Sequence, residues 1–300
     1  MSESAECRYL FNTARFLSQQ GDFSTVAVED EGFRGKICWS RVNQAGYSPL
    51  RAPFGGPDCQ GFWSGSAAAR LVACLVDELQ VAKIQTFYLT QPPDAYDQEG
   101  NYAFFRLLPE AGFELSHQDL NFHLVVNQPF RRHLHRSERW KLNKLIRHGF
   151  EFQRQQHIRW DEVYAFFLES RRRKGFELSM NRESLEKVFE LFPGQYALFS
   201  VVKENVTAAM AITIEVSPDI WYIFYTADNL IFRKFSPVVM LHAGIYNLAL
   251  DHKIKILDLG TSSLKGIVNS GVATFKRSLG GVASLKNTWV WRPGASQKSS

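Results

Sequence analysis

The chain has 300 residues, of which 45% are apolar, and a formal net charge of +5. This length and apolar content suit two globular domains or one large one. No window offers about 18 uninterrupted apolar residues, and the first residues lack a basic segment followed by an apolar run, so we expect neither a spanning helix nor a secretory signal, and a cytoplasmic chain.

Cysteine and histidine positions argue against several kinds of chemistry. The spacing of the four cysteines, at positions 7, 38, 59 and 74, matches neither a zinc site nor a disulfide framework. The eight histidines are scattered, and those of the basic middle region lack carboxylate or Cys partners. The sequence therefore predicts no metal site. It also lacks a Ser-His-Asp ordering or a nucleophile elbow, so no covalent enzyme intermediate is expected.

Charge is unevenly distributed along the chain. The formal net charge is −6 over residues 1–126, +8 over residues 131–174 and +3 over residues 175–300. A basic middle region favours an anionic partner. The candidates are a nucleotide, a nucleic acid, a diphosphate lipid and a membrane surface.

The first half of the chain shows alternating helix and strand patterns. It contains a strong apolar helical stripe at Leu71, Leu75 and Leu79. Three Pro and two Gly in residues 48–58 predict a loop there. In chain order, the predicted elements are a short helix at 6–17, strands at 24–29 and 36–42, a helix at 66–81, a strand at 84–89, a helix through Phe105 and Leu108, and one or two strands at 113–126.

The second half begins with a basic helix over residues 130–148. A helical wheel places four arginines on one narrow face of it: Arg132, Arg136, Arg139 and Arg147. They could bind phosphates, or they could form an ordinary solvated face. The elements predicted next are a strand at 150–155, helices at 160–174 and 182–191, and a three-stranded antiparallel meander at 196–203, 207–216 and 221–226.

Residues 221–260 read as strand, loop, helix and strand, and a last strand is predicted at 288–291. The loop carries Arg233 and Lys234, and we expect Ser236 to cap the helix that follows it. Two cations beside a helix N-terminus suit a phosphate. The alternative is an ordinary capped helix between two strands.

An internal repeat relates residues 66–90 to residues 236–260 without gaps. Six aligned positions hold identical residues: Ser66/Ser236, Leu71/Leu241, Ala73/Ala243, Lys83/Lys253, Ile84/Ile254 and Leu89/Leu259. The repeat predicts two similar α/β units in tandem, at 1–126 and 127–300. The copies differ at the end of their strands, where the second has Asp258-Leu259-Gly260 and the first has Tyr88-Leu89-Thr90.

Several short motifs, taken in order, resemble the Fem-type branch of the GNAT acyltransferase fold. They are RHGFEF (147–152), RRRKGF (171–176), AAMAITI (208–214), LDLGTSS (257–263), FKRSLGG (275–281) and, in the first unit, SPLRAPFGG (48–56). The resemblance implies an α/β (α+β) chain of two tandem GNAT-like domains. Each would have a mainly antiparallel sheet flanked by helices, with the first domain degenerate and the second carrying the activity.

The family resemblance also implies a function. Fem-type proteins transfer aminoacyl groups from tRNA to peptidoglycan precursors in bacterial cell-wall biogenesis. The partners expected are an anionic small-molecule or lipid-linked precursor, tRNA, and the surface of a membrane without a spanning segment. No bound cofactor is expected, and the acyl donor would be a co-substrate, either aminoacyl-tRNA or acyl-CoA.

Two departures from the family keep alternatives open. This chain has no room for the coiled-coil arm of some Fem proteins. Its donor loop, NLIFRKFSP at 229–237, lacks the glycines that bind pyrophosphate in acetyl-CoA users. An acyl-CoA-dependent N-acyltransferase with an unusual donor loop and a non-catalytic binder of anionic envelope precursors or RNA therefore remain as alternatives.

The candidate catalytic residues lie at the ends of the late elements. The resemblance implies a Phe-Lys pair near the active centre, matching Phe275-Lys276, whose lysine would stabilise charge on the reacting ester. Asp258 ends a buried strand and could orient or deprotonate an amine, or simply bond loop N–H groups. Tyr225 could donate a hydrogen bond to the leaving group, or pack among its aromatic neighbours.

Overall fold

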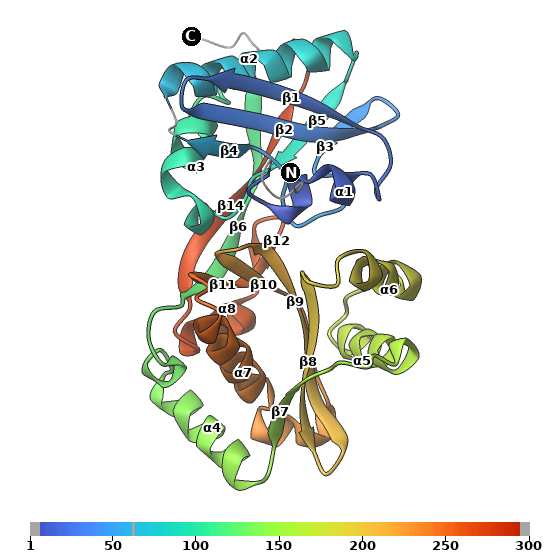
Figure 1. The fold of residues 1–300 in the computed structure, drawn as a ribbon, viewed down its shortest axis with the longest axis vertical. Coiled ribbons are helices and arrows are strands. Elements are labelled where there is room, and N and C mark those ends of the chain that lie inside the picture. Colours follow the sequence, from blue (N-terminus) through green and yellow to red (C-terminus); the bar gives the residue numbers. More distant parts are fainter. Residues whose placement is uncertain (1–6, 62–63, 295–300) are drawn as a thin grey trace. The chain divides into compact units, whose positions relative to one another are not determined.

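The computed structural model describes residues 7–61 and 64–294, which form two compact units (Figure 1). The first holds the described residues up to Asn121, together with Thr261–Asn269 and those from Ser284 on. The second holds Phe122–Gly260 and Ser270–Ala283. This division differs from the predicted ranges 1–126 and 127–300. The last strand pairs with a strand of the first unit, joining Thr288 to Thr90, and no local sequence pattern reports such a pairing.

The first unit is a mainly antiparallel sheet with the strand order β1-β2-β3-β5-β14-β6, and β4 pairs with β2. Its strands are β1 (Phe23–Asp30), β2 (Phe33–Val42), β3 (Ala45–Ser48), β4 (Asp58–Gly61), β5 (Thr86–Thr90), β6 (Phe113–Val125) and β14 (Val282–Trp291), with β12 (Ser263–Leu264) and β13 (Ile267–Val268) as a separate hairpin. Its helices are η2 (Leu10–Asn12), α1 (Ala14–Leu17), α2 (Gly65–Val81), η3 (Asp94–Tyr96) and α3 (Gln98–Phe105).

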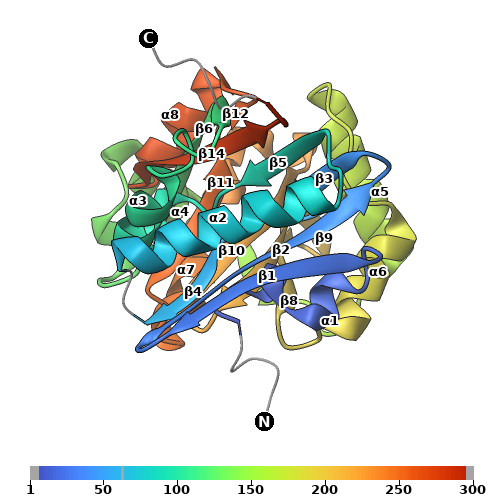
Figure 2. The ribbon, with the colours of Figure 1, turned by 90° about the horizontal axis from the view of Figure 1, so that it is seen from above.

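Helix α2 covers one face of that sheet, as Figure 2 shows. The side chain of Ser64 accepts a hydrogen bond from the Ala67 N–H and so caps the helix. The predicted apolar stripe of Leu71, Leu75 and Leu79 is fully buried. The core of the first unit therefore lies between this stripe and the sheet residues, among them Ile37 and Phe87.

The second unit has the strand order β6-β11-β10-β9-β8-β7, and residues 122–125 supply its part of β6. Its strands are β7 (Glu151–Arg154), β8 (Tyr196–Lys203), β9 (Val206–Ser217), β10 (Ile220–Asp228) and β11 (Ile256–Thr261). Its helices are η4 (Phe130–Arg132), α4 (Arg136–Arg147), α5 (Trp160–Arg173), α6 (Arg182–Leu191), η5 (Leu230–Phe235), α7 (Val238–Asp251) and α8 (Ser270–Ser278). Figure 1 shows α7 on one face of the meander and α5 and α6 on the other. The predicted antiparallel meander β8-β9-β10 is confirmed.

Both units contain the same parallel crossover, which confirms the predicted repeat at the level of connections. In the first, β3 and β5 are parallel neighbours joined through α2, and in the second, β10 and β11 are joined through α7. The aligned residues Lys83 and Lys253 both end the helix in a left-handed conformation, with φ of 54° and 58°. The local sequence repeat thus encodes the same helix ending twice.

Several local predictions need correction. Residues 130–132 form a separate 3₁₀ turn, and α4 begins only at Arg136 because His135 takes the N-cap position. Arg132 is therefore not on the α4 face. Ser236 does not cap α7, since it is left-handed with φ of 59° and Pro237 takes the cap position without a side-chain hydrogen bond. The predicted first helix, 6–17, is broken into η2 and α1, and Glu6 lies outside the described residues.

Among the described residues, none of the helices combines the length and the apolar character that crossing a membrane requires.

Candidate active site

Gly260 is the next-to-last residue of strand β11 and has an unusual backbone conformation. The Asp258 carboxylate Oδ1 accepts the Gly260 N–H at 2.7 Å. Gly260 has φ of 77°, and a Cβ built there would lie 3.3 Å from the ring of Tyr222. Both the left-handed backbone and the close ring favour glycine at this position. The Gly260 backbone is thus held by the side chain of Asp258, which is itself 2% exposed.

Lys276 binds the other polar group of the same glycine. Its Nζ donates to the Gly260 carbonyl at 2.8 Å, and the residue is only 8% exposed. The sequence motif that carries it folds as helix α8, which had not been predicted, and one buried side of this helix presents Ala273 and Lys276. The structure therefore brings Asp258 and Lys276 to one residue. A buried ammonium at the end of a strand is a strong local positive charge.

His242 lies beside this lysine and was missed by sequence reasoning. It is 4% exposed on α7, and its Nδ1 lies 2.8 Å from the Val238 carbonyl, to which it donates. Burial lowers the pKa of His242 to about 4; the hydrogen bond to Val238 opposes this shift and the charge of Lys276 adds to it. The imidazole is thus neutral near pH 7, with the proton on Nδ1.

Phe275 and His242 share an edge-to-face contact. Their ring centroids are 5.8 Å apart at an angle of 82°. The predicted Phe-Lys pair therefore makes two contacts here, Lys276 with the Gly260 carbonyl and Phe275 with His242. The internal repeat could have pointed to His242. It aligns with Val72, a buried apolar residue of α2, so a histidine there indicates a buried polar side chain.

Two further titratable side chains surround Asp258 on the neighbouring strands. Tyr222 is its direct partner on β10, and burial raises the pKa of Tyr222, with the Asp258 charge adding to the rise. His123 lies on β6; burial lowers its pKa, and Asp258 partly offsets this. The Nδ1 of His123 is buried without a hydrogen-bond partner among the described residues. Three titratable side chains, Asp258 included, thus lie on the adjacent strands β6, β11 and β10.

Tyr225 is engaged elsewhere. Its hydroxyl lies 2.6 Å from the Ser179 Oγ, and the Arg171 guanidinium lies 5.4 Å from its ring centre. Its ring stacks on Phe224 at 4.0 Å and packs against Phe167 of α5. Tyr225 therefore packs among its aromatic neighbours, and none of these contacts involves Asp258 or Lys276.

The predicted basic residues fall into two groups. Arg132, Arg136, Arg139 and Arg147 are exposed, and no hydrogen bond or ion pair joins their side chains to the described residues. Arg233 and Lys234 are also exposed and lie on η5, which Asn229 caps by accepting from the Ile231 N–H. Ser236 follows them directly, and its backbone N–H donates to the Arg233 carbonyl at 3.0 Å.

A cluster of cations around Phe235, here called the Phe235 cluster, was not predicted. The ammonium groups of three lysines lie near its ring centre: Lys144 at 4.9 Å, Lys234 at 5.3 Å and Lys203 at 6.0 Å. The His148 ring lies 5.0 Å from the same ring. The aromatic face partly offsets repulsion among the cations. Three elements, α4, β8 and η5, therefore meet at one basic and aromatic surface.

The matching strand end of the first unit is built differently. The Thr90 carbonyl, which aligns with that of Gly260, accepts the backbone N–H of Gly55 at 2.9 Å, and the Thr90 hydroxyl lies 3.1 Å from that of Thr288. The Pro- and Gly-rich loop thus occupies the place that a lysine takes in the second unit.

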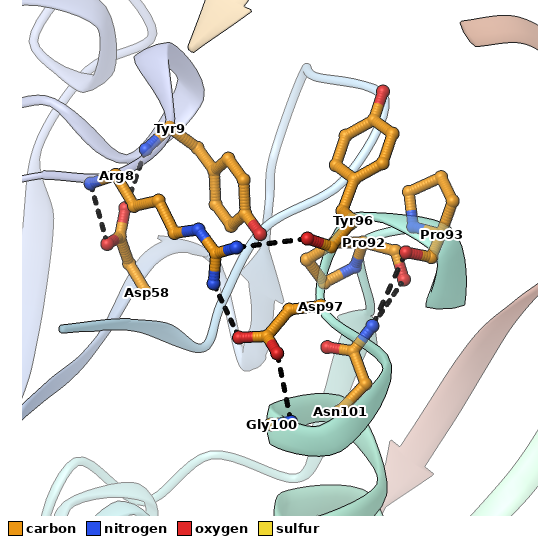
Figure 3. A network of polar contacts seen from close by, with 9 residues as sticks. All are labelled: Arg8, Tyr9, Asp58, Pro92, Pro93, Tyr96, Asp97, Gly100 and Asn101. Carbon is orange, nitrogen blue, oxygen red and sulfur yellow. Dashed lines mark hydrogen bonds and ion pairs between the residues drawn. The ribbon is translucent and has the colours of Figure 1, made fainter. Parts of the chain in front are cut away.

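The first unit instead carries a structural polar network, drawn in Figure 3. Asp58 accepts from the N–H groups of Arg8 and Tyr9 and from the Asn12 amide. The Arg8 guanidinium pairs with Asp97 and donates to the Tyr96 carbonyl. The network fastens the start of the described chain to the loop before α3.

Comparison with solved structures identifies the fold. A structure described as FemX matches with a TM-score of 0.71 at 13% identity, covering 94% of this chain and 92% of that one. The C-terminal domain of a putative lysylphosphatidylglycerol synthetase from Agrobacterium fabrum matches with a TM-score of 0.60 at 12% identity, covering 98% and 92%. A tandem GNAT protein from the clavulanic acid biosynthesis pathway matches with a TM-score of 0.50 at 9% identity, covering 93% and 84%.

The chain thus has the Fem-like tandem GNAT fold that the motifs predicted. No protein-family model and no curated protein matches the sequence.

Proposed function

We propose that this chain is an acyltransferase that moves an acyl or aminoacyl group from an activated donor to an amine. The observation that carries the proposal is the buried Lys276 ammonium held on the Gly260 carbonyl at the end of β11. A fixed cation in a site partly shielded from water stabilises the oxyanion that forms when an ester carbonyl is attacked. The fold shared with FemX supports the same class of reaction.

The chemistry follows the residues around Gly260. The nitrogen lone pair of the acceptor attacks the donor carbonyl carbon and forms a C–N bond, while the carbonyl oxygen becomes an oxyanion stabilised by Lys276. The C–O bond of an ester donor, or the C–S bond of a thioester, then breaks, and the leaving group takes up the proton that the amine loses. Asp258 is the carboxylate that orients the acceptor amine.

The proposed binding site for the acyl donor is the Phe235 cluster together with the exposed Arg233. The Lys144, Lys203 and Lys234 cations suit a phosphate-rich carrier, because several cations on one surface bind adjacent phosphates. Aminoacyl-tRNA and acyl-CoA both provide phosphates. The donor loop, without the usual glycines, favours aminoacyl-tRNA.

The acceptor is proposed by analogy with Fem-type proteins to be an amine of an anionic cell-wall precursor. One similar structure is that of a putative lysylphosphatidylglycerol synthetase, so a lipid acceptor is tested as well. At the end of β5 in the first unit, the Gly55 N–H binds the carbonyl that corresponds to the one bound by Lys276 in the second unit. Because the first unit has no lysine at this point, its proposed role is to position the acceptor.

The test is a transfer assay with labelled donors and paired acceptors. Lysyl-tRNA, alanyl-tRNA and acetyl-CoA are each combined with a nucleotide-linked muropeptide or with phosphatidylglycerol vesicles, and the product is detected by mass spectrometry. The proposal expects one donor to give a stable amide with the muropeptide, and Lys276→Met to abolish it. An ester formed on phosphatidylglycerol would instead show that the acceptor is a hydroxyl group. Binding of these donors without transfer by the wild type would favour a non-catalytic binder.

A further inference from the structure

The β12–β13 hairpin presents apolar side chains to solvent. Leu264 is 66% exposed, Ile267 79% and Val268 51%. Leu264 and Ile267 are cross-strand partners and flank a two-residue turn, so their side chains leave the same face. Two-residue turns on a protein surface are usually flanked by polar residues, because exposed large apolar groups promote association. The hairpin therefore has an apolar tip.

This tip is rigidly supported. The turn residues Lys265 and Gly266 both have positive φ, 49° and 80°, as a tight hairpin turn requires. The Asp119 carboxylate Oδ1 accepts from the Ser263 hydroxyl at 2.6 Å and from the Gly266 N–H at 3.1 Å. The Ser263 Oγ also accepts from the Leu120 N–H at 2.8 Å. Exposure of the tip is thus built into the fold and does not depend on a loose loop.

The charge around the hairpin in the sequence is entirely basic. From Leu259 to Ser300 the chain has no Asp or Glu, and six residues are Lys or Arg. One of them, Lys265, is an exposed turn residue of the hairpin itself. Exposed apolar side chains beside a lysine suit an interface where acyl chains lie beneath anionic headgroups. The Asp119 carboxylate that binds the hairpin is only 8% exposed. A second copy of this chain fits less well, because its equal positive charge would be repelled.

We propose that the β12–β13 hairpin is a membrane-contact element that docks on a bilayer surface containing anionic lipid. Leu264, Ile267 and Val268 enter the interfacial region, while Lys265 remains at the headgroups. This contact is independent of the transfer reaction proposed above. It would bring the enzyme to lipid-anchored substrates without a spanning helix.

The test is flotation of the full-length protein with vesicles of phosphatidylcholine alone or with one-third phosphatidylglycerol. Wild type is expected to float with the anionic vesicles and much less with the neutral ones. Leu264→Thr/Ile267→Thr/Val268→Thr keeps β-forming residues and should lower binding by about tenfold or more. Lys265→Gln should lower it by about fivefold, and high salt should weaken binding by the wild type.

The matched control is Val42→Thr/Val81→Thr, which changes exposed apolar residues of the same unit and should leave binding unchanged. Lys276→Met should also float normally, so that loss of transfer and loss of docking are distinguishable. Failure of the wild type to bind anionic vesicles, or equal binding by the triple variant, would overturn the proposal. So would a dimeric wild type that the triple variant makes monomeric, because the tip would then serve self-association.

Discussion

Asp258 and Lys276 bind the two polar backbone groups of one residue. The Asp258 carboxylate accepts the Gly260 N–H, and the Lys276 ammonium donates to the Gly260 carbonyl, although 18 residues separate the two side chains in the sequence. The pair therefore fixes the backbone conformation of Gly260 near the end of β11. It also places one acidic and one basic side chain at a single glycine, which is the arrangement that the proposed transfer reaction uses.

Lys276→Met should affect both catalysis and stability. Loss of the cation is expected to lower turnover about 100- to 1000-fold, because the charge acts mainly on the transition state. The Gly260 carbonyl also loses its donor, so the free energy of unfolding should fall by about 1–3 kcal/mol. Single-turnover transfer kinetics and urea unfolding at one pH measure the two effects.

A matched control for Lys276 exists in the first unit. Lys286 also donates its ammonium to a backbone carbonyl, that of Pro53 at 3.0 Å. Lys286→Met should therefore cost similar stability and leave turnover unchanged. Equal loss of turnover in both variants would show that the effect of Lys276 is structural.

Much of the fold was predictable because local apolar patterns encode it. The α2 stripe, the β8–β9–β10 meander and the repeated crossover with Lys83 and Lys253 all follow from residues close in sequence. The pairing of β14 with β5 was not, since it joins Thr90 to Thr288 across 198 residues. The real division of the chain into units depends on that pairing.

The site was predictable only in part, for a similar reason. Asp258 and Lys276 stand in recognisable motifs. His242 occupies a buried position of a helix whose other inward residues are apolar, so it looked like part of the core. The lysines of the Phe235 cluster come from α4, β8 and η5, and no linear pattern connects them.

The Phe235 cluster should contribute to binding of a phosphate-rich donor. Lys144→Gln/Lys203→Gln/Lys234→Gln is expected to weaken aminoacyl-tRNA binding and to reduce the dependence of log affinity on log salt by about one unit per lysine that contacts a phosphate. Filter binding across a salt series measures both quantities.

The control for the cluster removes the same charge elsewhere in the second unit. Arg159, Lys187 and Lys253 are exposed, and their joint change to Gln should have a much smaller effect on the slope. Arg136→Gln/Arg139→Gln tests the exposed α4 face separately. An unchanged slope in the Lys144/Lys203/Lys234 variant would leave that face as the remaining candidate.

Asp58 should be essential for the stability of the first unit. Its two oxygens accept from the N–H groups of Arg8 and Tyr9 and from the Asn12 amide, as Figure 3 shows in part. Asp58→Asn offers one oxygen and turns an NH₂ group toward an N–H donor, so unfolding should become easier by about 1–3 kcal/mol. Urea unfolding measures this, with exposed Asp77→Asn as the control. Equal stability of the two variants would contradict the assignment.

His242 should make stability depend on acid. Its pKa is about 4 in the folded chain, because burial and the Lys276 charge disfavour the imidazolium, against about 6.5 when unfolded. The unfolded state therefore binds more protons between these values, and stability present above pH 6.5 is lost as the pH falls. From pH 7.5 to pH 5 the loss due to this group is about 2 kcal/mol.

His242→Asn isolates that contribution, since the Asn amide can still donate to the Val238 carbonyl while the titrating group is gone. His123 and His133, whose pKa values are also lowered by burial, remain in both proteins and cancel in the difference. Urea unfolding at pH 7.5 and pH 5 should show the wild type losing about 2 kcal/mol more than the variant. In Lys276→Met, the NMR titration of His242 should move to higher pH, because the neighbouring positive charge is removed. An unmoved titration would mean that the two side chains are not electrostatically coupled.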